Sequence, residues 1–135
     1  LEIQAVKYFT KHAPDKLVGK LLEETKEIIA RCEPGDSSDT NSLKLIGDAQ
    51  AVDWNLHGQI IKTLNNKIII DAYRVNSIKI RLIKLEQTSL SQVNVVSTMN
   101  EHLDIIYAVQ LRDQDAAERA LIKHIENARS RAVNN

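Results

Sequence analysis

The sequence has few of the residues that break or cross-link a chain. Among its 135 residues are four Gly, two Pro and one Cys. The single cysteine, Cys32, excludes an internal disulfide. So little Gly and Pro argues against a loop-rich or disordered chain. We therefore expect one compact domain over residues 1–135.

The chain also lacks an excess of one charge and a long apolar run. Eighteen basic side chains balance eighteen acidic ones, so we do not expect direct contact with nucleic acid, which normally needs a positive excess. No run of about twenty apolar residues could span a membrane, and no signal segment opens the sequence. These absences favour a cytoplasmic protein with no membrane partner. The first residue is Leu1 rather than Met, which suggests a segment of a longer protein.

What the sequence does have is apolar residues at spacings of three and four, without sustained alternation. This pattern predicts an all-α fold, an antiparallel bundle of about six helices. The predicted helices cover about residues 1–12, 14–32, 42–64 and 67–86, followed by a fifth that ends near 112 and a sixth after Asp113. Turn-forming residues predict an exposed loop over 33–41.

Ionisable residues interrupt the apolar stripes of three predicted helices. Asp53 and His57 are one helical turn apart, so their side chains share a face with Cβ atoms about 5–6 Å apart. His102 and His124 lie on the stripes of the two last helices, which should be antiparallel neighbours. The last stripe also includes Ala117, Leu121 and Ala128. His12, at a helix end without such company, is expected to face solvent.

Three histidines and one carboxylate in a core suggest a metal site at the centre of the bundle. A buried, unpaired carboxylate costs several kcal/mol and imidazoles need partners, and a cation would satisfy both. Imidazole and carboxylate ligands suit Zn, Ni, Fe or Mn. Four protein ligands could close a tetrahedral site or leave octahedral positions open, and spacing does not choose. The plainer interpretation is that each histidine is a hydrogen-bonded core residue.

The last two predicted helices contain a sequence segment similar to one found in a known family. It runs from Glu101 to Asp113 as EHLDIIYAVQLRD and continues with Ala, Leu and His at positions 117, 121 and 124. This segment resembles part of the C-terminal effector-binding (FCD) domain of FadR-type GntR transcription regulators. Upstream, Asp53-Trp-Asn-Leu-His57 resembles the family's Asp, three residues, His element, and Asn66 its following Asn. Lys67 and Arg112 depart from the Pro and Gly common there.

The resemblance implies a FadR-like sensor domain in which Asp53, His57, His102 and His124 bind one divalent metal. In such regulators the metal meets the carboxylate of a small organic acid, and a winged helix-turn-helix precedes the domain and contacts DNA. Family members commonly form homodimers and are not enzymes. Because a carboxylate usually needs a further cationic or hydrogen-bonding contact, candidate effector-binding residues are Asn66, Arg74 and Arg81.

Two other functions are compatible with the residues alone. An open divalent site could serve a metal-dependent enzyme, although no separate general base is evident. A di-iron oxidase would need paired Glu-x-x-His elements, which the sequence lacks. The chain could also be a structural helical bundle whose histidines are core residues. Metal content would separate that bundle from the other two.

Overall fold

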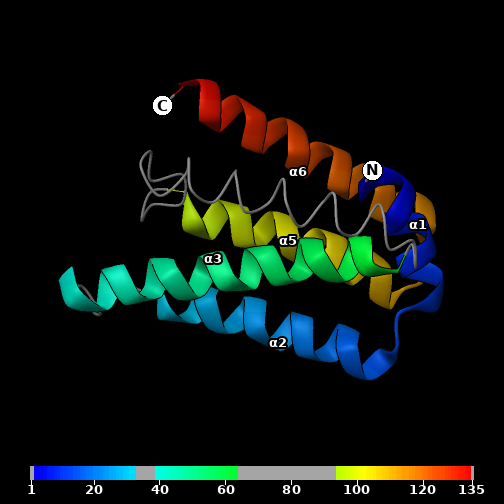
Figure 1. The fold of residues 1–135 in the computed structure, drawn as a ribbon, viewed down its shortest axis with the longest axis horizontal. Helices are drawn as coiled ribbons and strands as arrows, with labels where there is room; N and C mark the ends of the chain where they lie inside the picture. The colour runs from blue at the N-terminus through cyan, green and yellow to red at the C-terminus, as the bar shows by residue number, and fades with distance from the viewer. Residues whose placement is uncertain (1, 33–38, 64–93, 135) are drawn as a thin grey trace.

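The computed structural model describes residues 2–32, 39–63 and 94–134. Every regular element in these ranges is an α-helix, and no strand occurs in them. The helices are α1 (Glu2–His12), α2 (Asp15–Arg31), α3 (Asp39–Lys62), α5 (Val95–Gln110) and α6 (Gln114–Asn134) (Figure 1). The all-α prediction is confirmed for the described residues. The helix predicted over 67–86 lies outside them.

Helices α2, α3, α5 and α6 run roughly along the long axis of the molecule (Figure 1). Helix α2 is antiparallel to α3, and α5 is antiparallel to α6, as short connections between neighbours predict. The short helix α1 packs against α3, α5 and α6 at one end of the bundle. None of the described helices combines the length and the apolarity needed to cross a membrane.

Helix boundaries follow the capping residues. Pro14 precedes α2 in an extended conformation, and its carbonyl accepts the Val18 N–H at 3.1 Å. Asp113 caps α6 as predicted, because its Oδ1 accepts the Ala116 N–H at 3.0 Å. Helix α3, however, begins at Asp39 and not near residue 42. The predicted loop is too long at this end because its last residues, Asp, Thr and Asn, also favour the first turn of a helix.

The core consists of two apolar clusters with a polar layer between them. The smaller cluster comprises Ile28, Leu45, Ala49, Val95 and Met99. The larger one gathers residues from all five helices, including Phe9, Leu21, Leu56, Ile105 and Leu121. Along α3, Asp53 falls between Ala49 and Leu56, and along α5 His102 falls between Met99 and Ile105. The ionisable residues therefore lie at the junction of the two clusters.

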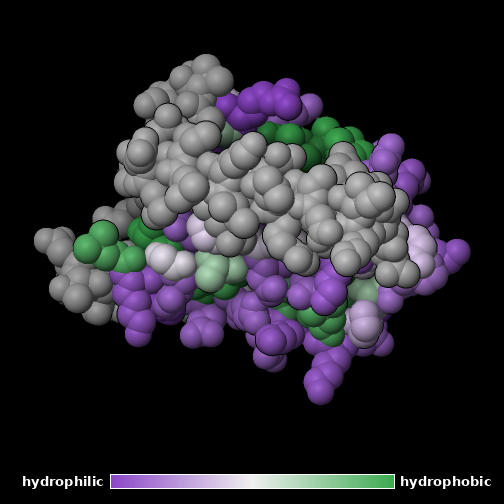
Figure 2. Space-filling model, viewed as in Figure 1, coloured by the Kyte–Doolittle hydropathy of each residue, from purple (hydrophilic) through white to green (hydrophobic). Residues whose placement is uncertain are grey.

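One inward prediction on α6 is wrong. Ala117, Leu121 and His124 are buried as expected, but Ala128 is exposed. Near its end, α6 turns Asn127 and Arg131 toward α5, where both contact Glu101. A polar contact thus replaces the apolar stripe there. Elsewhere on the viewed face the described surface is mostly hydrophilic, as amphipathic helices require (Figure 2).

Candidate metal centre

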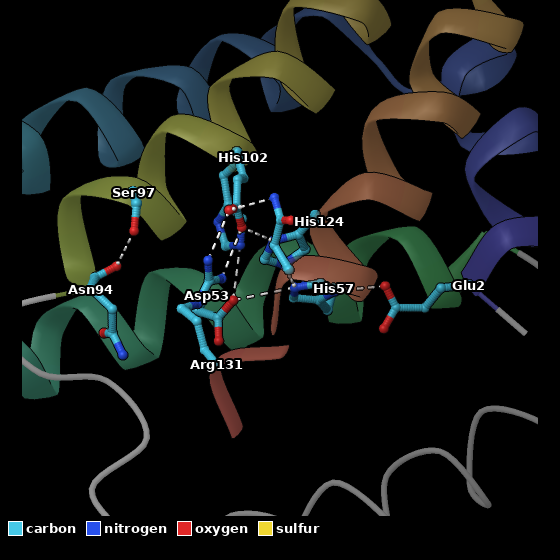
Figure 3. A network of polar contacts seen from close by, with 10 residues as sticks. Glu2, Asp53, His57, Asn94, Ser97, His102, His124 and Arg131 are labelled. Atoms are coloured by element: carbon cyan, nitrogen blue, oxygen red, sulfur yellow. Dashed lines mark hydrogen bonds and ion pairs between the residues drawn. The ribbon is translucent and has the colours of Figure 1, made fainter. Parts of the chain in front are cut away.

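Four side chains from three helices meet inside the bundle (Figure 3). Asp53 and His57 come from α3, His102 from α5 and His124 from α6. One ligand atom from each residue lies within 4.8 Å of the others. His102 and His124 are buried, and the side chains of Asp53 and His57 are only 16% and 14% exposed. The antiparallel packing of α5 and α6 is what brings the two distant histidines together.

The closest distances in this cluster resemble those between ligands of one cation. Asp53 Oδ1 lies 2.9 Å from His102 Nε2 and 3.2 Å from His57 Nε2. The Nε2 atoms of His57 and His124 are also 3.2 Å apart. Two atoms bound about 2.1 Å from the same ion are about 3.0 Å apart at a right angle and about 3.4 Å apart at a tetrahedral angle. The spacing therefore fits a shared divalent ion.

The hydrogen bonding of His102 also points to a cation. Its side chain is fully buried, and neither ring nitrogen has a hydrogen-bond partner among the described residues, although Nε2 lies 2.9 Å from Asp53 Oδ1. A buried polar group without a partner is costly, typically about 1–3 kcal/mol. Three imidazoles and one carboxylate form a donor set suited to Zn, Ni, Mn or Fe. These four residues thus fit the divalent metal that the sequence predicts, and they are the ones that would hold it.

Glu101 orients His124 from behind. Its carboxylate accepts hydrogen bonds from His124 Nδ1 at 2.7 Å, from the Asn127 amide at 3.0 Å and from both terminal nitrogens of Arg131 at 2.9 Å. Because Nδ1–H donates to Glu101, the lone pair of His124 Nε2 faces the centre. Burial alone would raise the pKa of Glu101, but these partners outweigh it and lower the pKa to about 2. Glu101 therefore stays an acceptor at any physiological pH.

Glu2 plays the corresponding part for His57. Its Oε2 lies 2.6 Å from His57 Nδ1. The carboxylate accepts the Nδ1–H bond, which again leaves Nε2 directed at the centre (Figure 3). Two of the three histidines thus have a carboxylate behind the ring, an arrangement that is common around protein-bound metals.

The charges of the cluster are strongly coupled. Burial would raise the pKa of Asp53, but contacts with His102 and His57 hold that pKa well below its usual range. Burial would lower the pKa of His57, but Asp53 and Glu2 raise it to about 10. Burial and the neighbouring histidines lower the pKa of His124 to about 4. Without a cation at neutral pH, His57 is therefore protonated and His124 is neutral.

The structure brings together all four residues predicted as metal ligands. The three predicted effector contacts, Asn66, Arg74 and Arg81, lie outside the described residues. His12 is exposed, as expected for a histidine at a helix end. Sequence reasoning missed the outer partners Glu2, Glu101 and Arg131. Of these three, only Arg131 could have been found from helical spacing, because it lies two turns after His124 on the same face of the helix.

A surface groove on α3 is separate from the cluster. It has a volume of about 420 Å³. Its lining among the described residues is Ala51, Trp54, Asn55, Gly58, Gln59 and Lys62. At 100° per residue these positions lie on the face of α3 opposite Asp53 and His57. Among the described residues, the groove is therefore directed away from the cluster of Asp53, His57, His102 and His124.

One Asp and three His meet around one point in this helical bundle, and together they could hold a metal ion. The chain matches the family model of the FCD domain over residues 1–127, and it belongs to that family. FCD domains are the effector-binding domains of GntR-type transcription regulators. Comparisons with curated proteins and with solved structures find no match.

Proposed function

We propose that this FCD domain senses a small organic carboxylate at a divalent metal, Zn, Ni, Mn or Fe, held by Asp53, His57, His102 and His124. It does so as part of a FadR-type, non-enzymatic regulator that is cytoplasmic and homodimeric. Effector binding shifts the helices of the bundle, and an N-terminal winged helix-turn-helix domain outside this chain converts the shift into altered DNA binding.

The convergence of four ligand atoms within 4.8 Å is the observation that supports the proposal most strongly. An ordinary core would place hydrogen-bond partners around His102, yet in the described part of the chain neither ring nitrogen has one, and Nε2 has only the close approach of Asp53 Oδ1 at 2.9 Å. A divalent ion at this point supplies positive charge and open coordination positions for a carboxylate. The chain's own residues orient the ligands, with Glu2 and Glu101 behind two of the rings.

The effector must bind one arrangement of the helices more tightly than another, because only differential affinity shifts an equilibrium. Since the candidate ligands lie on α3, α5 and α6, contacts at the centre bear on three helices at once. We propose Asn66, Arg74 and Arg81 for the remaining contacts with the carboxylate, as in the sequence prediction. Glu101 is not a candidate for these contacts, because its negative charge would repel the carboxylate of the effector.

Metal content and a ligand screen test the proposal together. The protein is purified, reconstituted with each of the four ions and assayed for bound metal. Small mono- and dicarboxylates are then screened by thermal shift with and without the ion. The proposal predicts about one ion per chain and metal-dependent stabilisation by a carboxylate that is recovered unchanged. Conversion of the stabilising compound would indicate a metal-dependent enzyme, and no bound ion would indicate a structural bundle.

A histidine pair provides the matched control. His124→Ala removes a buried candidate ligand, whereas His12→Ala removes an exposed histidine outside the cluster. We expect His124→Ala to lose metal affinity and carboxylate response together, and His12→Ala to keep both. A carboxylate response that survives in His124→Ala would contradict the shared site.

A further inference from the structure

Glu2 differs from the other residues around the cluster in the helix that supplies it. Glu101 and Arg131 come from α5 and α6, which already carry His102 and His124. Glu2 comes from the first turn of α1, a helix with no member of the cluster. Its 2.6 Å contact with His57 Nδ1 is therefore a direct polar link between α1 and the metal centre (Figure 3).

The rest of α1 is held by apolar packing. Ala5, Val6 and Phe9 are buried in the larger cluster and fix the helix from its second turn onward. The first turn lacks such anchors, since Ile3 is partly exposed and Gln4 is exposed. The N–H groups of a first helical turn also have no partner within the helix. The first turn is thus a unit that can detach without loss of the core.

The contact with His57 is more than a solvated ion pair. Both side chains are mostly buried, at 14% exposure for His57 and 18% for Glu2. Exposed ion pairs contribute little to stability, but burial removes the screening that weakens them. The ring nitrogen that Glu2 accepts from is also opposite the one that faces Asp53 and His124. The orientation that Glu2 gives to this ring therefore sets the position of Nε2 among the candidate ligands.

We infer that Glu2 is a positioning residue that fixes the ring of His57 for cation binding and thereby couples occupation of the centre to docking of the first turn of α1. The coupling is reciprocal, because a contact that strengthens ion binding is strengthened by the ion to the same degree. This inference rests on the cation site of the proposed function. It adds the route by which the centre can act on α1.

Zinc affinity measured by chelator competition tests the positioning role. Loss of a group that orients a ligand typically lowers metal affinity about 10–100-fold. We expect that loss for Glu2→Ala and a smaller one for Glu2→Gln, because the amide oxygen still accepts the Nδ1–H bond. Glu23→Ala, at an exposed acid on α2, should bind zinc as the wild type does.

Hydrogen exchange along α1 tests the coupling. Saturating zinc should slow exchange in the second turn of α1, whose N–H groups bond to carbonyls of the first turn, by about the same 10–100-fold factor in the wild type. It should not slow it in Glu2→Ala. Glu101→Gln is the matched control, because it weakens the centre through His124 and leaves the Glu2 contact in place. With zinc raised to saturation, this variant should show the wild-type slowing in α1.

The outcomes distinguish a failure of the inference about Glu2 from a failure of the proposed function. If wild-type protein binds zinc and Glu2→Ala binds it equally well, the inference is wrong and the proposed function stands. If Glu2→Ala binds more weakly but zinc leaves α1 exchange unchanged in the wild type, the coupling is refuted. If the wild type binds none of the four candidate ions, both the inference and the proposed function are refuted.

Discussion

At the residue scale, the chemistry of the cluster depends on what each imidazole contacts with its outer nitrogen. For His57 and His124 that contact is a carboxylate, which makes Nδ1 the donor and Nε2 the inward atom. His102 has no such partner within residues 2–32, 39–63 and 94–134, and its burial is complete. The three histidines are therefore unequal, and their substitutions should have different effects.

Replacing His102 should affect both stability and metal binding. His102→Leu removes the 2.9 Å contact with Asp53 Oδ1 and leaves that mostly buried carboxylate with one partner fewer, so we expect the metal-free protein to lose about 1–3 kcal/mol in free energy of unfolding. The same variant should lose the stabilisation that zinc gives to the wild type. Urea unfolding with and without zinc measures both quantities, with His12→Leu as the exposed control. A gain of metal-free stability in His102→Leu would contradict the pairing of His102 with Asp53.

Metal binding should also release a proton from His57. Because Asp53 and Glu2 raise the pKa of His57 to about 10, the ring is protonated at neutral pH and a cation must displace that proton. We expect about one proton released per ion, and an apparent affinity that rises about tenfold per pH unit between pH 7 and 9. Calorimetry in buffers with different ionisation enthalpies counts the protons. Affinity that falls over this range would refute the assignment.

The same pKa gives a sign for stability without metal. A raised pKa in the folded state means that the contribution of His57 is complete below its usual value of 6.5. That contribution is lost as pH rises through about 10. In the metal-free protein, the Glu2 and Asp53 contacts of this ring should therefore weaken at alkaline pH.

At the scale of the elements, the turn between α5 and α6 sets the register that brings His102 and His124 together. Arg112 ends α5 with a φ of 56°, the only positive φ outside glycine in the described residues. The Asp113 N–H bonds to the Ala108 carbonyl at 3.0 Å, which closes the helix end. The Arg112 side chain donates to the Thr10 carbonyl and to Asp15. It thereby joins this turn to the one between α1 and α2.

Two substitutions at Arg112 should distinguish the backbone from the side chain. A left-handed conformation costs a non-glycine residue about 1–2 kcal/mol, and a lost hydrogen bond costs about 1 kcal/mol. Arg112→Ala keeps the backbone strain and loses the contacts, so it should destabilise by about 1 kcal/mol. Arg112→Gly relieves the strain and should be near neutral. Denaturation midpoints test this order, with Arg119→Ala as an exposed control, and an equal loss in both variants would contradict it.

The helices and the four-residue cluster could be predicted because they follow helical periodicity. Asp53 and His57 share a face by spacing, and His102 and His124 interrupt apolar stripes on neighbouring helices. The roles of Glu2 and Glu101 could not be predicted, because they depend on how α1 and α6 pack against their neighbours. The predicted start of α3 and the predicted inward position of Ala128 were wrong for related reasons. In both, local polar preferences outweigh the apolar pattern at a helix end.

At the scale of the whole molecule, the four candidate ligands lie between the two apolar clusters of the core. The smaller cluster joins α2, α3 and α5, and the larger one extends to α1 and α6. A cation at the junction would bind α3, α5 and α6 to one another through their side chains. Occupation of the centre should therefore be visible in global unfolding.

Zinc should raise the melting temperature substantially. A ligand at a hundred times its Kd stabilises a folded protein by about 2.7 kcal/mol, provided that it binds only the folded state. For a domain of this size about 1 kcal/mol corresponds to roughly 4 °C, so we expect a shift of about 10 °C. Calorimetry with zinc and then with excess chelator measures the gain and its reversal. A melting temperature indifferent to zinc and chelator would argue against an ion in the core.

The most direct measurement is an anomalous difference map from crystals of the zinc-loaded protein at the zinc absorption edge. The account predicts one strong peak inside the bundle, within about 2.0–2.2 Å of Asp53 Oδ1 and of the Nε2 atoms of His57, His102 and His124. A map without a peak between these four side chains, or with zinc only at surface residues, would contradict it.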